Sequence, residues 1–103
     1  MATRGTIEIN FRQAMNQANK IDAIANDLST LSKSKFGGSL QNLAGAWKGE
    51  NASLYLSKGS TLQSKMNTTA SSLHTAASDI RTAAKRLYDA EMTALSIAES
   101  RTY

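Results

Sequence analysis

The sequence predicts an all-α protein, an antiparallel helical hairpin that dimerises into a four-helix bundle, and three observations support this. The chain has no proline and no valine but sixteen alanines among 103 residues, a composition that favours helix over sheet. Apolar residues recur every three or four positions along two long segments, as they do on one face of a helix. A short glycine-bearing stretch, LAGAWKGEN at 43–51, separates these segments.

The first segment is expected to be helical over about 6–44. Its apolar positions step alternately by four and three residues: Ile7, Phe11, Ala14, Ala18, Ile21, Ala25 and Leu28. The pattern then slips by one residue within KSKFGG and resumes at Phe36, Leu40, Leu43 and Trp47. The slip indicates one of two structures. Either the helix is straight and the slip absorbs the mismatch between 3.6 residues per helical turn and the 3.5-residue average of the apolar spacing, or the helix kinks there. Because Gly37 and Gly38 are poor helix formers, we expect one helix with a soft spot there.

The second segment is expected to be helical over about 51–98, with the same alternation unbroken. Its predicted seam is Tyr55, Gly59, Leu62, Met66, Thr69, Leu73, Ala76, Ile80, Ala83, Leu87, Ala90, Ala94 and Ile97. Such a seam predicts packing against a nearly antiparallel neighbour at a shallow angle. Many members are small, so the two helices can approach closely.

The connection between the helices is expected at about 45–50. Gly45 weakens the end of the first helix, and Gly49 can adopt the positive φ that reverses the chain. Asn51, or Gly49 itself, can cap the second helix. Two long helices joined by so few residues must run antiparallel, so residues 1–103 are expected to form one helical-hairpin domain. Trp47 continues the first apolar row, and its ring is expected to cover the end of the hairpin core.

A lone hairpin of this kind has little core. It pairs two apolar rows but leaves flanking positions exposed, among them Leu31, Leu54, Ala77, Ala84 and Leu95, and small cores give little stability. Two hairpins packed together would cover these flanks as a four-helix bundle. The sequence therefore predicts a homodimer, with a heterodimer as the alternative.

Several function classes find no support in the residues. The chain has no cysteine and one histidine, His74, whose Asp79 lies five residues away, too far for a pair on one helix face. We therefore predict no enzyme activity, no metal and no cofactor. No apolar run reaches the roughly 20 residues of a membrane span, so we expect no stable membrane insertion. Residues 28–86 are basic, with eight Lys/Arg against two acids, but without an Arg-rich run or interleaved aromatics we favour a solvated surface over nucleic-acid binding.

The turn carries the most specific motif. Trp47-Lys48-Gly49, placed at mid-chain between two long helical segments of a chain of about one hundred residues, resembles the WXG family of early-secreted-antigen-like proteins. This resemblance implies export by a type VII (ESX) secretion system, without a cleavable signal peptide. It also implies a role as secreted substrate, co-secretion partner or virulence-type effector. The implied partners are the chain itself or a sister WXG protein, and the type VII secretion ATPase. The alternative is an intracellular helical adaptor in which the W-x-G turn is coincidental.

A second mark of the family lies late in the second helix, where exported members carry an aromatic or large apolar residue and an acid four positions later. Tyr88 has Met92 at that spacing, whereas Leu87 has Glu91. The aromatic form is thus absent and the looser form is present. The resemblance gives Leu87, Tyr88 and Glu91 as candidate secretion-signal residues, although Leu87 also fits a plain seam position. In an antiparallel dimer, Trp47 of one chain would approach this segment of the other and form a two-part signal.

Overall fold

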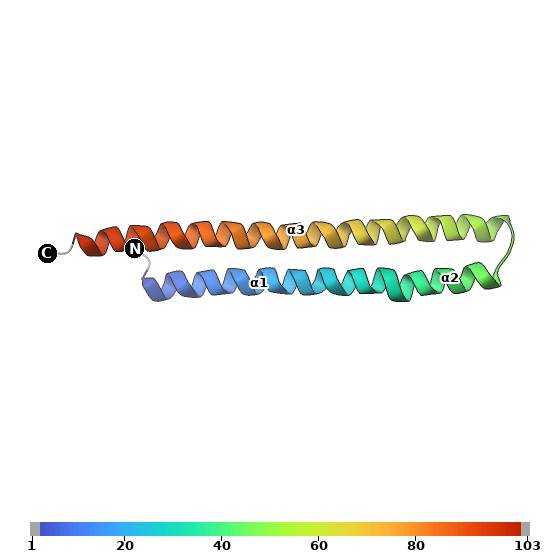
Figure 1. Ribbon diagram of the computed structural model, residues 1–103, viewed down its shortest axis with the longest axis horizontal. Helices are drawn as coiled ribbons and strands as arrows, with labels where there is room; N and C mark the ends of the chain where they lie inside the picture. The colour runs from blue at the N-terminus through green and yellow to red at the C-terminus, as the bar shows by residue number, and fades with distance from the viewer. Residues whose placement is uncertain (1–2, 102–103) are drawn as a thin grey trace. The chain divides into compact units, whose positions relative to one another are not determined.

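The computed structural model describes residues 3–101, and all its regular structure is helical (Figure 1). Helix α1 runs Arg4–Thr30 and passes into a π-helix, η1, at Leu31–Phe36, which continues as α2 at Gly37–Ala46. After a short connection, α3 runs Glu50–Ser100. No strand occurs within residues 3–101, so the predicted all-α class with two long helical arms is confirmed. The connection occupies 47–49, inside the expected 45–50.

The chain divides into two compact units. The turn unit is Asp22–His74, and it contains the end of α1, η1, α2, the connection and the first half of α3. The terminal unit combines Met1–Ile21 with Thr75–Tyr103, so it pairs the first part of α1 with the second part of α3. Each unit has its own contacts between helices, and each is described separately below.

Within the turn unit the two arms run antiparallel. Near the start of the unit, Asp22 contacts His74 through a 2.7 Å hydrogen bond between Oδ1 and Nδ1. Further along, Leu40 of α2 lies against Gly59 of α3, so closely that a Cβ on Gly59 would be 2.5 Å from Leu40 Cδ2. From the first contact to the second, the residue number rises along the first arm and falls along α3. Gly59 is therefore a point where the absence of a side chain lets the helices approach.

The terminal unit is a second antiparallel helix pair. The rings of Phe11 and Tyr88 meet with their centroids 4.8 Å apart. Two turns further along α1, Asn19 Oδ1 accepts a 2.8 Å hydrogen bond from the Arg81 guanidinium. Again the numbers change in opposite directions along the two helices.

The soft spot expected in KSKFGG is the π-helix η1. A π-helix widens the turn and takes up one extra residue relative to an α-helix. The sequence pattern slips by one residue between Leu28 and Phe36, which is where η1 lies. The two glycines after it, Gly37 and Gly38, are helical. The soft spot thus takes the form of a single wide turn within one helical arm.

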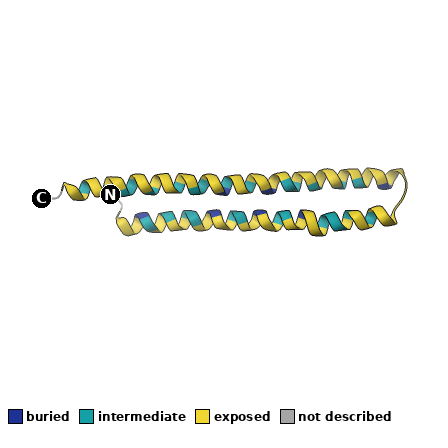
Figure 2. Ribbon diagram, in the orientation of Figure 1, coloured by how far each residue is buried: buried dark blue, intermediate teal, exposed yellow. Residues whose placement is uncertain are grey.

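The buried residues are small, and they lie on one face of each arm (Figure 2). Within residues 3–101 the buried set is Ile7, Ala18, Ala25, Ser32, Ala52, Ala70 and Ala77. For the first arm, the predicted row is the buried one, because Ile7, Ala18 and Ala25 all belong to it. Five of the six apolar members of this set are alanines, so the arms gain close approach but little buried apolar area.

For α3 the predicted seam was wrong by one residue over much of its length. Ala77 is completely buried and Ala84 is half-buried, although both were expected on the flank. Four large members of the predicted seam are instead exposed: Tyr55 (64%), Leu62 (50%), Leu87 (58%) and Ile97 (49%). Helix α3 carries two adjacent apolar rows, and spacing alone does not decide which of two neighbouring rows faces the first arm. The second row is left on the surface.

Candidate functional site

The W-x-G turn is built by the ends of α2 and α3 in the turn unit. Trp47 leaves the helix in an extended conformation, with φ −116° and ψ 124°, while its backbone N–H still donates to the Leu43 carbonyl at 2.9 Å. Gly49 has a φ of 115°, as predicted from the sequence, and no other residue described here has a positive φ. Its carbonyl accepts the Ser53 N–H at 3.1 Å, which closes the first turn of α3. Gly49 rather than Asn51 is thus the N-cap of the second helix, which begins at Glu50.

The Trp47 ring packs on Tyr55 rather than deep in the core. The two ring centroids lie 5.4 Å apart with the planes inclined by 50°, an arrangement typical of favourable aromatic pairs. Trp47 remains 39% exposed and Tyr55 64% exposed. The sequence predicts a ring that covers the end of the core, and Tyr55 was not predicted as its partner. The tryptophan therefore presents a large part of its surface at the turn.

An apolar groove lies beside this turn on the turn unit. It is lined by residues of η1, α2 and α3, namely Phe36, Leu40, Leu43, Leu54, Tyr55, Lys58, Gly59 and Leu62. Leu54 and Leu62 are each at least half exposed. One cation, Lys58, is among the residues that line it. Tyr55 lines the groove and also contacts the Trp47 ring, so the exposed indole lies next to the groove.

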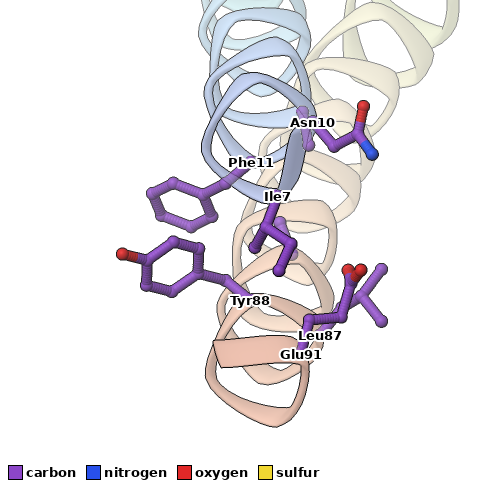
Figure 3. A pocket seen from close by; sticks show the side chains of 8 residues that line it. Ile7, Asn10, Phe11, Leu87, Tyr88 and Glu91 are labelled. Carbon is purple, nitrogen blue, oxygen red and sulfur yellow. The ribbon is translucent and has the colours of Figure 1, made fainter. Parts of the chain in front are cut away.

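The second candidate segment lies in the terminal unit, where Leu87, Tyr88 and Glu91 line a small hollow together with residues of α1 (Figure 3). Figure 3 shows the Phe11 and Tyr88 rings side by side, with Leu87 and Glu91 on the other side of Ile7. The hollow has a volume of about 50 Å³, far below the roughly 300–1,000 Å³ of small-molecule sites. It is a packing feature that holds these side chains in place.

The three candidate residues differ in burial. Tyr88 is half-buried through its contact with Phe11, and Leu87 is 58% exposed. Glu91 is half-buried at the rim of the hollow. The seam position expected at Leu87 is therefore taken by Tyr88, one residue further on. Leu87 and Glu91, four residues apart on one helix face, remain accessible as an apolar and acidic pair.

The residues that could carry chemistry are sparse. His74 pairs with Asp22 across the turn unit, and their side chains are 43% and 26% exposed. Asp22 was not predicted as the partner of His74, because a contact between arms depends on their register. Over residues 3–101 no group of three or more His, Cys, Asp or Glu side chains could hold a metal ion. No helix within the same range has the length and apolar character needed to cross a membrane.

No family model matches the chain, and neither the curated proteins nor the solved structures include a detectable match. The resemblance to the WXG family therefore rests on the turn motif and on the helical organisation around it.

Proposed function

We propose that this protein is a small non-enzymatic helical protein exported by a type VII (ESX-like) secretion system, as substrate, co-secretion partner or effector. The observation that carries the proposal is the geometry of the W-x-G turn. Gly49 at φ 115° makes the chain reversal, while Trp47 keeps 39% of its surface accessible. The glycine thus has a structural role in the turn, and the tryptophan has surface available for recognition.

The late part of α3 supports the same proposal. Leu87 is exposed and Glu91 lies at the rim of a hollow, while Phe11 fixes the neighbouring Tyr88. A helical surface that presents an apolar and an acidic side chain from a fixed backbone is suited to recognition by another protein. On this proposal, Trp47 of one chain and the Leu87–Glu91 segment of its partner are read together by the secretion ATPase.

The partner is proposed to be a second copy of the chain or a sister WXG protein. Support comes from the exposed second row of α3, which includes Leu62 and Leu87, and from the apolar groove beside the turn. Exposed apolar side chains that follow one helix face are typical of protein interaction surfaces. A second hairpin laid on this row would complete a four-helix bundle.

Secretion assays in the native host test export. The wild-type chain should accumulate in the culture supernatant, and loss of the secretion ATPase should abolish this. Trp47→Ala and Glu91→Ala should each abolish export while far-UV circular dichroism stays unchanged. Asp89→Ala, which removes a nearby exposed acid, serves as the control and should be exported. Absence of the wild-type chain from the supernatant would overturn the proposal and favour an intracellular adaptor. ATPase-independent export would exclude the type VII route, and normal export of Trp47→Ala would exclude Trp47 as part of the signal.

Light scattering tests the pairing. The wild-type protein at micromolar concentration should have twice the mass of one chain if it pairs with itself. Leu62→Glu places a charge in the exposed row and should weaken the dimer, whereas the neighbouring Ser60→Glu should not. A stable folded monomer under these conditions would exclude self-pairing. Its conversion to a one-to-one complex with a sister chain would identify the heterodimer.

A further inference from the structure

The turn unit contains a reciprocal pair of hydrogen bonds between its arms. Ser32, in η1, is completely buried and is the only polar residue among the buried ones within residues 3–101. Its Oγ donates to the Gln63 backbone carbonyl at 3.3 Å, and Gln63 Nε2 donates to the Ser32 backbone carbonyl at 2.9 Å. We call this pair the polar clasp. It joins residues 31 apart in sequence.

The clasp depends on the wide turn. The Gly37 N–H donates to the Ser32 carbonyl, five residues back, which is the hydrogen bond of a π-helix. Gly37 also leaves room for the amide, because a Cβ at this position would lie 2.9 Å from Gln63 Nε2 and 3.3 Å from the Ser32 carbonyl oxygen. A glycine, a π-turn and a glutamine thus meet at one place.

The wide turn keeps the apolar residues before η1 and those after it on the same side of the first arm. Before η1, Ala25 is buried and Leu28 half-buried; after it, Leu40 and Leu43 are half-buried. Without an extra residue in between, the α-helical repeat from Leu28 would bring Ser39 rather than Leu40 toward α3. One residue moves the facing position by about 100° around a helix of 3.6 residues per turn.

We propose that η1 and the polar clasp form a register device: η1 takes up one surplus residue, and the clasp fixes where that surplus is placed. The clasp is suited to this role because alanines and leucines tolerate several alignments, whereas a part-buried hydrogen-bonding pair is satisfied in only one. The device sets which face of α2 meets α3. It thereby sets how the turn presents Trp47 to Tyr55. The inference concerns the fold of the chain and holds whether or not the chain is exported.

Single-residue deletions test whether η1 takes up the one surplus residue. Deleting Ser34 should convert η1 to an α-helix and keep both apolar rows facing α3, so the protein should stay folded. Deleting Asn42 removes a residue from regular α-helix and should turn Leu43 and Trp47 away from α3. We expect the urea midpoint to fall much further for the Asn42 deletion than for the Ser34 deletion. The Trp47 emission, from the only tryptophan, should shift only for the Asn42 deletion. Equal effects of the two deletions, or an unfolded Ser34 deletion, would overturn the assignment of the surplus to η1.

Disulfide trapping tests the clasp, since the chain has no cysteine of its own. Leu40→Cys with Gly59→Cys should oxidise readily, because these positions are in contact. The second pair is Ser39→Cys with Gly59→Cys, in a Leu40→Ala background that removes the overlap between Leu40 and a side chain at residue 59. This pair reports a face of α2 rotated by one residue toward α3, so it should oxidise slowly. In Gln63→Leu the ratio of the two rates should fall by up to about tenfold, the effect expected from losing the one hydrogen bond that the Gln63 side chain donates. An unchanged ratio in Gln63→Leu would overturn the role of the clasp.

Discussion

Replacing Gly49 by alanine separates the backbone requirement of the turn from all other effects. A φ of 115° lies in a region that residues with a Cβ rarely adopt, and holding such a residue there costs about 1–3 kcal/mol. Apart from the residues next to it in the chain, no heavy atom of the described residues lies within 4 Å of the position that a Cβ would take on Gly49. The whole expected loss of stability is therefore local backbone strain, with no contribution from overlap with residues elsewhere in the chain.

Gly45 provides the matched control. It lies four residues earlier in α2, is likewise exposed, and a Cβ there also meets nothing within 4 Å in the described part of the chain. Because Gly45 is helical, Gly45→Ala should stabilise by about 0.8–1 kcal/mol. The two substitutions add the same methyl group at open sites, yet the free energies of unfolding should differ by about 2–4 kcal/mol from these two ranges.

Urea unfolding followed by circular dichroism at 222 nm measures the difference. At an m-value of about 1–3 kcal/mol/M, the midpoints of the two variants should lie about 0.7 M or more apart. All variants must be compared at one protein concentration, because pairing of chains would make stability concentration-dependent. If Gly49→Ala were as stable as Gly45→Ala, the positive φ would not be a constraint on the turn, and the glycine of the W-x-G motif would need another explanation.

Three further substitutions probe the packing. Asn67→Leu should raise the urea midpoint, because Asn67 Oδ1 is buried without a hydrogen-bond partner among residues 3–101. Such an unsatisfied atom costs about 1–3 kcal/mol of stability. A lower midpoint would show that the amide is satisfied. Gly59→Leu should destabilise by about 1–3 kcal/mol through overlap with Leu40, and a double-mutant cycle with Leu40→Ala should recover part of the loss. Phe11→Ala should cost more than Ile9→Ala in thermal unfolding, because Phe11 contacts Tyr88 whereas Ile9 is 51% exposed; equal melting temperatures would argue against the ring contact.

Features that depend on local chemistry could be predicted from the sequence. The absence of proline and valine, together with the apolar spacing, indicated the two helical arms, and glycine placement indicated the turn and the positive φ of Gly49. The one-residue slip between Leu28 and Phe36 located the irregular segment. Each of these signals can be recognised along the sequence itself, without knowing how the two arms align.

Features that depend on how the arms align could not be predicted in the same way. Tyr55 as the partner of Trp47, Asp22 as the partner of His74, and the polar clasp all join residues of different arms. Their pairing follows from the length of the turn and from the extra residue in η1. The error in the α3 seam has the same origin, because two apolar rows lie side by side and only the alignment selects one.

The two rows of α3 also connect the fold with the proposed pairing of chains. The row that faces the first arm is rich in alanine, including Ala52, Ala70 and Ala77, and alanine buries little apolar area. The row left on the surface holds larger side chains, among them Tyr55, Leu62, Leu87 and Ile97. Small residues thus bring the arms of one chain together, while the larger apolar residues face outward, where a partner would gain most from covering them. This distribution is the reverse of what an isolated helix pair needs for stability, and it favours a chain whose core is completed by a second chain.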